Sequence, residues 1–374
     1  MSAHQTFPRL KVAAVQASSV VRDAPEWFDL AATLDKAVSL TAEAGRNGAR
    51  LIVFPECWLP GYTCWSLDLA DRSGFDEIWA NFLWNSVEVP GPETKALREA
   101  AKKAGAYLVI GINERDKVFP GRMYNSILYI GPNGEVIGTH RKICITVQER
   151  FFHTQGDGGE NLRTVFDTEI GKIGGSICGE HTQLPLMYNW IMQGVQIHCS
   201  LWPGKTGLSG STDLLTRAMC RIGHCFGVLS ATYFADKDMP KNFYKNCSFN
   251  TPGSIRGGSG VIGPNGNYIV GPVYGEETII YADIDLAELD KSRFATNLTG
   301  YYSRWDILNL NVRQGSFEPV QPMLASEVGL PVSESSQTGD LAARVKQLEQ
   351  QIAVFLAAKG QDTGKKTEGC SSGD

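Results

Sequence analysis

The sequence lacks the features that would place it in a membrane or direct it out of the cell. No apolar run among its 374 residues approaches the length needed to cross a bilayer. The first apolar run, Leu10–Ala17, is short and interrupted by Lys11 and Gln16, so it does not match the core of a signal peptide. We therefore expect a cytoplasmic protein without a membrane partner.

An excess of positive charge is also absent. Lys and Arg together number 35, Asp and Glu number 40, and the net charge is -5. A mildly acidic chain has no overall attraction for a phosphate backbone, and no Lys/Arg cluster is interleaved with aromatic residues. Nucleic acid is therefore not expected as a partner.

Sequence signals for metals and cofactors are missing as well. None of the nine cysteines forms a C-x-x-C pair, and the six histidines show no H-E-x-x-H spacing. Gly258–Gly263 matches G-x-G-x-x-G, but a turn and an apolar strand pattern follow it instead of a helix, so the dinucleotide interpretation fails. We expect no metal and no cofactor, and reduced thiols of which one or two at most do chemistry.

Short apolar segments alternate with helical patterns over residues 1–313. Apolar spacings of three and four predict four helices, over Leu30–Gly45, Glu93–Ala104, Leu184–Gly194 and Leu214–Gly223. Val- and Ile-rich runs, typical of buried strands, recur at Leu10–Ala17, Arg50–Glu56, Tyr107–Asn113, Asn125–Ile130, Lys172–Cys178, Val195–Trp202, Phe226–Tyr233, Gly260–Ile262 and Thr278–Ile284. The alternation favours an α/β layered domain with a mixed sheet.

The composition changes after this domain. Residues 314–340 are rich in Ser, Pro and Glu without a strong period, which is typical of a linker. A heptad pattern then predicts a helix over residues 341–360, with apolar positions at Leu341, Val345, Leu348, Ile352 and Phe355. Two alternatives stay open for this helix, which either packs back on its own domain or joins subunits. Residues 361–374 are polar and expected to be disordered.

Three segments place reactive side chains at the ends of predicted strands. Leu51–Glu56 ends on a carboxylate, and His140-Arg-Lys142 follows a strand and turn, with Glu149 seven residues later. Lys172–Cys178 ends on a thiol just before a helical pattern, where backbone N–H groups can stabilise a thiolate and a developing oxyanion. Taken singly, each segment is equally typical of a solvated edge or an inert buried cysteine.

Together and in this order, the segments resemble the nitrilase superfamily of carbon–nitrogen hydrolases, from about Leu10 to Arg313. Phe-Pro-Glu56, His-Arg-Lys142 and Cys178-Gly-Glu-His carry the resemblance, which is strongest to the nitrile- and cyanide-hydrolysing branch. It implies an α-β-β-α sandwich that pairs into homodimers and often into larger spirals. The C-terminal helical tail lies outside the resemblance.

The resemblance also implies roles for individual residues. Cys178 is the expected nucleophile, Glu56 the general base and Lys142 the group that stabilises the tetrahedral intermediate, with Glu149 positioning the substrate or the lysine. Candidate substrate-binding residues are Tyr62, Gly179, Glu180, His181 and Trp202. Trp usually follows the nucleophile in nitrilases, so Gly179 should enlarge or reshape the pocket beside the thiol. Ile222 stands where a Glu is common.

The implied reaction converts a small organic nitrile to a carboxylic acid and ammonia through a thioimidate and a thioester on Cys178. A thiol with the usual pKa of about 8.5 is mostly protonated at neutral pH, so a carboxylate must take its proton and an ammonium must stabilise the anion. An amidase or carbamoyl hydrolase would use the same residues. Two further hypotheses are a papain-like hydrolase that pairs Cys178 with His140, His181 or His224, and a catalytically silent scaffold.

Overall fold

The computed structural model describes residues 8–63, 74–243, 251–294, 296–312, 345–346 and 348–350. The chain divides into two units, Met1–Phe317 and Glu318–Asp374. In the second unit the described residues are helical, and they fall within the helix predicted over residues 341–360. Most of that helix, the linker over residues 314–340 and the tail over residues 361–374 lie outside the described residues, so this domain division stays a prediction.

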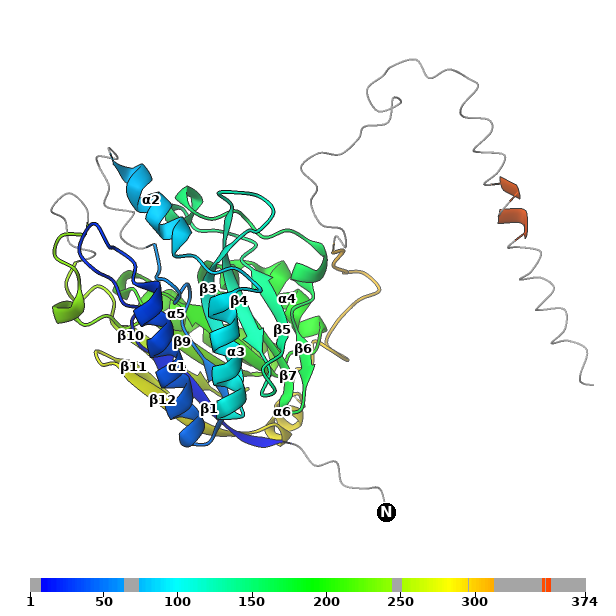
Figure 1. The fold of residues 1–374 in the computed structure, drawn as a ribbon. Helices are drawn as coiled ribbons and strands as arrows, with labels where there is room; N and C mark the ends of the chain where they lie inside the picture. Colours follow the sequence, from blue (N-terminus) through cyan, green and yellow to red (C-terminus); the bar gives the residue numbers. More distant parts are fainter. Residues whose placement is uncertain are drawn as a thin grey trace, which may run out of the picture. The chain divides into compact units, whose positions relative to one another are not determined.

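The first of two six-stranded sheets has the strand order β12-β1-β2-β3-β4-β5. β1, β2 and β3 are parallel, whereas the other neighbours are antiparallel. The strands are β1 (Arg9–Gln16), β2 (Ala49–Val53), β3 (Tyr107–Arg115), β4 (Met123–Ile130), β5 (Val136–Arg141) and β12 (Thr278–Asp285). Helices α1 (Leu30–Arg46) and α3 (Pro92–Ala104) lie side by side over one face of this sheet (Figure 1).

The second sheet has the order β11-β10-β9-β8-β7-β6 and a parallel centre formed by β7, β8 and β9. Its strands are β6 (Phe166–Thr168), β7 (Gly171–Ile177), β8 (Ile197–Trp202), β9 (Phe226–Ala231), β10 (Gly257–Ile262) and β11 (Tyr268–Tyr274). Helices α4 (Leu184–Met192) and α5 (Ser209–Gly223) connect the parallel strands. Two further helices in the described part of the chain are α2 (Phe75–Trp84) and α6 (Ala287–Ser292).

Local sequence signals explain where the helices begin and end. Asp29 caps α1, because its carboxylate accepts a hydrogen bond from Ala32 N (2.9 Å). Pro92 opens α3, where a missing N–H costs nothing, and Gly105 closes it in the left-handed conformation. The ends of α1 and α3 therefore follow from single residues at their termini.

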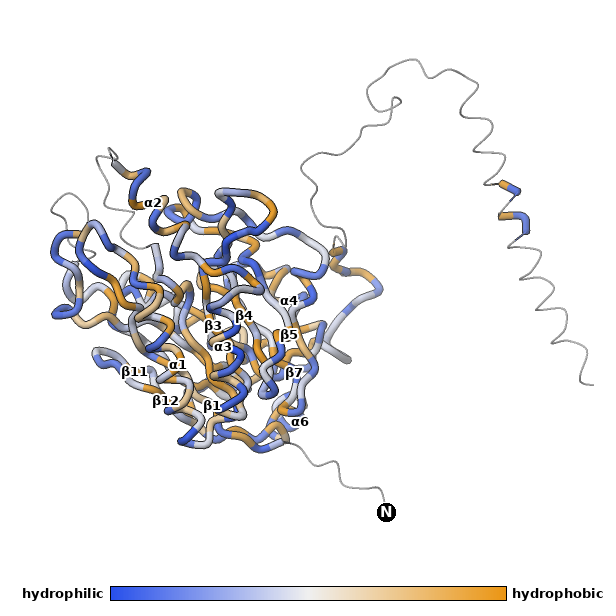
Figure 2. The backbone as a smooth tube through the Cα atoms, in the orientation of Figure 1, coloured by the Kyte–Doolittle hydropathy of each residue, from blue (hydrophilic) through white to orange (hydrophobic). Residues whose placement is uncertain are grey.

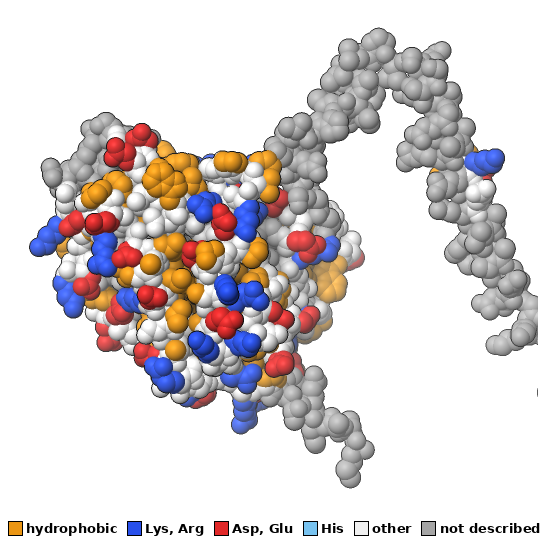
Figure 3. All heavy atoms as spheres, viewed as in Figure 1, with side chains coloured by type: hydrophobic (Ala, Val, Ile, Leu, Met, Phe, Trp, Pro, Cys, Tyr) orange, Lys and Arg blue, Asp and Glu red, His pale blue; other side chains and the backbone are white. Residues whose placement is uncertain are grey.

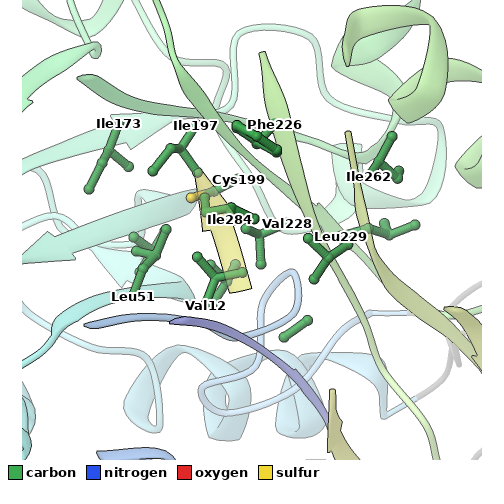
Figure 4. Packing of buried hydrophobic residues seen from close by; sticks show 14 of the residues in the cluster. Val12, Leu51, Ile173, Ile197, Cys199, Phe226, Val228, Leu229, Ile262 and Ile284 are labelled. Atoms are coloured by element: carbon green, nitrogen blue, oxygen red, sulfur yellow. The ribbon is translucent and has the colours of Figure 1, made fainter. Parts of the chain in front are cut away.

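The main hydrophobic core lies between the two sheets. Figure 4 shows Val12 and Leu51 of the first sheet facing Ile197, Cys199 and Val228 of the second, and all five are buried. Hydrophobic segments run along these inner strands, while the outer helices alternate between hydrophilic and hydrophobic residues (Figure 2). Further cores join the first sheet to α1 and α3, and α4 to α5. The result is an α-β-β-α sandwich, which confirms the predicted fold class.

The outer surface carries charges of both signs. Acidic and basic side chains are interspersed on the face drawn in Figure 3. Among the described residues, no helix is both long enough and apolar enough to cross a membrane.

Candidate active site

The turn that follows β2 places Glu56 beyond the carboxyl end of that strand, where it is buried. The chain runs close along β3 there, and Leu59 N–H donates to Gly111 O (3.3 Å). This approach requires a glycine, because a Cβ added at Gly111 would lie 2.2 Å from Pro55 O and 2.6 Å from Cys57 N. Strand β3 thus fixes the backbone that holds the Glu56 carboxylate.

Lys142 follows β5 directly, and its side chain is completely buried. Nζ donates to Glu56 Oε1 at 2.8 Å and to the two carboxylate oxygens of Glu149 at 2.9 and 2.8 Å. Glu149 lies on the 3₁₀ helix η2 (Gln148–Phe151) and also accepts a hydrogen bond from Thr146 N. One ammonium group is therefore shared by two carboxylates, and three of the four predicted catalytic residues meet.

Asn125 is a member of this cluster that the sequence reasoning missed. Its Nδ2 group donates to Glu56 Oε1 at 2.8 Å and to Glu149 Oε1 at 2.7 Å, and its backbone carbonyl oxygen accepts from Lys142 N at 2.8 Å. An amide in a completely buried strand is a signal that could have found it, because a buried polar group needs partners.

Cys178 stands at the end of β7, where the chain enters the 3₁₀ helix η4 (Cys178–Thr182). Its φ of 49° lies in the left-handed region, which non-glycine residues seldom adopt and which often marks a functional turn. The carbonyl oxygen of Cys178 accepts a hydrogen bond from His181 Nδ1 (2.8 Å), so His181 stabilises this backbone conformation.

The Cys178 thiol is buried and faces the charges of the first sheet. Burial raises its pKa well above the usual range, and the Glu56 carboxylate adds to this effect. Lys142 and the backbone N–H of Gly179 act in the opposite direction. The Cys178 thiol is therefore protonated at rest, and it would need a neighbouring base to become a thiolate.

The two glutamates that share Lys142 have opposite proton affinities. Burial raises the pKa of Glu56 to about 8, against the opposing effect of Lys142, and the Glu149 charge raises it further. Burial also acts to raise the pKa of Glu149, but Lys142, His153 and the Thr146 N–H outweigh it and hold that pKa far below the usual range. The surroundings therefore favour the ionised form of Glu149 beside Lys142 and the protonated form of Glu56.

The predicted substrate-binding residues fall into two sets. Tyr62 lines a small pocket beside Glu56. The space beside Gly179 is free of close neighbours, since an added Cβ would meet only Thr146 Oγ1, at 3.6 Å. The other three residues turn inward. Glu180 is bonded to protein donors through both carboxylate oxygens, and the His181 ring stacks on Trp202 with centroids 5.2 Å apart.

Known proteins with the same fold and sequence pattern define the class of this enzyme. The carbon–nitrogen hydrolase family model matches residues 11–294. A bifunctional nitrilase/nitrile hydratase of Nicotiana tabacum is 35% identical over 86% of this chain and 90% of its own length. Nitrilase 3 of Arabidopsis thaliana is 34% identical over 85% and 91%. The crystal structure of the C. elegans NitFhit protein superposes with a TM-score of 0.63 at 21% identity, over 84% of this chain and 70% of that one.

A carboxylate, an ammonium and a thiol gathered at the edges of two stacked sheets are the features of a thiol hydrolase. The chain belongs to the carbon–nitrogen hydrolase family, within the nitrilase superfamily, and is a nitrilase-type hydrolase. This confirms the family that the three sequence segments indicated.

Proposed function

We propose that the protein hydrolyses a small organic nitrile to a carboxylic acid and ammonia, with Cys178 as the nucleophile. One observation carries the proposal. Glu56 Oε1 is held by Lys142 and Asn125, whereas no donor among the described residues contacts the buried Oε2 atom. A carboxylate fixed through one oxygen and open at the other can receive a proton without moving.

The first half of the reaction forms a covalent adduct. Glu56 takes the proton of the Cys178 thiol, the sulfur bonds to the nitrile carbon, and the nitrile nitrogen takes the proton from Glu56. The product is a thioimidate. Lys142 stabilises the negative charge that develops during this step, because its ammonium lies buried beside Glu56 and Glu149.

The second half consumes two waters. The first adds its hydroxyl group to the thioimidate carbon and a proton to nitrogen, which gives a tetrahedral intermediate. Glu56 then moves the hydroxyl proton to nitrogen, ammonia leaves, and a thioester remains. A second water breaks the carbon–sulfur bond, releases the acid and restores the Cys178 thiol. If the tetrahedral intermediate loses sulfur instead of ammonia, the product is an amide.

Relatives support a nitrile substrate and both products. The 35% identical tobacco protein is named a bifunctional nitrilase/nitrile hydratase, which covers acid and amide formation. The alternative is an amidase or carbamoyl hydrolase, because an amide would enter the same path at the tetrahedral stage.

Ammonia release from a panel of paired nitriles and amides tests the proposal, with Cys178→Ala as the control. We expect turnover of at least one nitrile and its loss in Cys178→Ala. Turnover of amides alone would reassign the protein to the amidase alternative. Turnover that survives in Cys178→Ala would exclude a Cys178 intermediate.

The papain-like hypothesis makes a different prediction for the same assay. It requires a histidine beside the thiol, yet His140 faces Glu180, His224 faces Thr296, and His181 Nε2 faces Ser200 and His198. We therefore expect Lys142→Ala to abolish turnover and His224→Ala to retain it.

A further inference from the structure

Glu180 joins two strand ends that carry catalytic residues. Its Oε1 atom accepts a hydrogen bond from Ile143 N at 2.6 Å, and its Oε2 atom accepts one from Ile177 N at 3.0 Å. Ile143 directly follows Lys142, and Ile177 directly precedes Cys178. A single buried carboxylate therefore touches the backbone beside the catalytic ammonium and beside the nucleophile.

The two strand ends belong to different sheets. β5 lies at the edge of the first sheet and β7 lies in the second, so no backbone ladder sets the distance between Lys142 and Cys178. Glu56 and Asn125 also come from the first sheet. The nucleophile is thus the one catalytic group that must be placed relative to the others across the interface between sheets.

His140 fixes the carboxylate in turn. Its Nε2 atom lies 3.0 Å from Glu180 Oε2, and its Nδ1 atom lies 3.2 Å from Asn161 O. Both neighbours are acceptors, so both contacts are hydrogen bonds when both ring nitrogens carry hydrogen. The edge of the ring packs on Trp190 (centroids 5.4 Å apart). Burial acts to raise the pKa of Glu180, but His140 and the two N–H donors outweigh it and hold the pKa below the usual range.

We propose that Glu180 is a positioning residue that sets the separation of Lys142 and Cys178 through its bonds to Ile143 and Ile177, with His140 as its partner. The proposal rests on the function proposed above. It assigns Glu180 a role through the backbone of both loops, in place of the substrate contact that the sequence suggested.

Glu180→Gln tests this bridge, the pair of hydrogen bonds from Ile143 N and Ile177 N to the Glu180 carboxylate, with little change of side-chain shape. The amide keeps one acceptor oxygen, but its NH₂ group cannot accept from a backbone N–H, so one strand end is released. We expect kcat to fall by about 100-fold, the cost of misplacing reacting groups by about 1 Å, with KM little changed. The pH profile of Cys178 alkylation by iodoacetamide should move to higher pH, because Lys142 no longer stabilises the thiolate as well.

Glu114→Gln is the matched control. Glu114 is also a buried carboxylate, bonded to Arg141 and to Ser126 Oγ (2.7 Å), but none of its bonds reaches the nucleophile loop. We expect it to lower thermal stability while kcat per folded molecule and the alkylation profile stay at the wild-type values.

His140 supplies a second, graded test. His140→Gln retains an N–H donor for Glu180 and should keep much more activity than His140→Leu, which retains none. Activity that falls only in proportion to the loss of folded protein, in both Glu180→Gln and His140→Leu, would overturn the proposal and leave Glu180 a purely structural residue.

The alkylation readout separates this proposal from the proposed function. Alkylation by iodoacetamide reports on Cys178 without any substrate being present. An unshifted alkylation profile in folded Glu180→Gln would therefore contradict the positioning role of Glu180 even if nitriles are hydrolysed. A shifted profile in a protein that hydrolyses neither nitriles nor amides would support the bridge and refute the function.

Discussion

Glu56 and Glu149 contact the same ammonium group, yet their surroundings shift their pKa values in opposite directions. Glu149 accepts two hydrogen bonds from Lys142 and one from Thr146 N, while Glu56 accepts one from Lys142. Glu149 accepts more of these hydrogen bonds and stays ionised. Its negative charge makes ionisation of Glu56 harder. We therefore propose that Glu149 acts as a fixed counter-ion and Glu56 as a proton carrier.

The pH dependence of Glu149→Gln tests this division at the scale of single residues. Glu56 must be ionised to accept the thiol proton, so wild-type kcat/KM should fall as the pH drops below about 8. The Glu149 charge raises the pKa of Glu56, so its removal should move this acid limb to lower pH. The maximal rate should also fall, since Lys142 loses a partner. The measurement is a profile of ammonia release against pH.

Glu160→Gln is a suitable control for that profile, because Glu160 is an exposed glutamate. Its acid limb should coincide with that of the wild type. An acid limb in Glu149→Gln that stays in place or moves to higher pH would contradict the assignment of roles.

The expected roles of Glu56, Lys142 and Cys178 came from the family resemblance, because the three segments taken singly left those roles open. The sequence says less about the side chains that support these residues. Asn125 lies inside an apolar run, and the hydrophobic pattern does not show which partners a polar side chain finds. Glu180 and His181 were expected to face the substrate because they follow the nucleophile, but η4 turns both toward the protein interior.

At the scale of elements, β3 approaches the Glu56 turn so closely that a single added methyl group would disturb the packing. Gly111→Ala would place Cβ against Pro55 O and Cys57 N, which are backbone atoms that cannot rotate away. We expect the free energy of unfolding to fall by about 1–3 kcal/mol and turnover to fall with it as Glu56 is displaced. Urea unfolding and ammonia release measure the two effects.

Gly210→Ala in helix α5 controls for the substitution itself. Nothing lies within 4 Å of its added Cβ, so we expect a neutral or slightly stabilising effect of about 0.4–1 kcal/mol. Equal stability of Gly111→Ala and the wild type would show that the turn can move away from β3 at no cost.

The element pattern explains which strands were predictable. Strands buried on both faces, such as β3 and β4, carry continuous apolar runs and were predicted. The edge strands β5 and β6 are partly exposed, and β6 is only three residues long, so neither has such a run. The apolar runs also do not show which of two sheets a strand joins, since local sequence does not specify long-range pairing. The expectation of two sheets came from the family resemblance.

At the scale of the whole molecule, helices α4 and α5 expose apolar side chains. Leu184, Leu214 and Ile222 are 73%, 64% and 48% exposed, and an apolar pocket lies between the two helices. The family resemblance predicts a homodimer, and we expect a second copy of the chain to cover this face, because exposed apolar patches often mark interfaces. If the tail does not join subunits, Ile222→Lys should therefore reduce the mass measured by light scattering to that of a monomer.

Ile269→Lys is the matched control for the dimer face. Ile269 is similarly exposed but lies on the edge strand β11 of the second sheet. Its mass should equal that of the wild type. A reduced mass in Ile269→Lys with an unchanged mass in Ile222→Lys would place the interface at β11.

The C-terminal heptads make a separate prediction about assembly beyond a dimer. Val345 and Leu348 are helical, as the heptad pattern predicts. If the tail joins dimers, truncation at about residue 325 should lower the mass to that of a dimer, and truncation combined with Ile222→Lys should give a monomer. If the tail packs back on its own domain, truncation alone leaves the number of subunits unchanged. Light scattering of the three proteins distinguishes these outcomes, because each interface is then removed with the other intact.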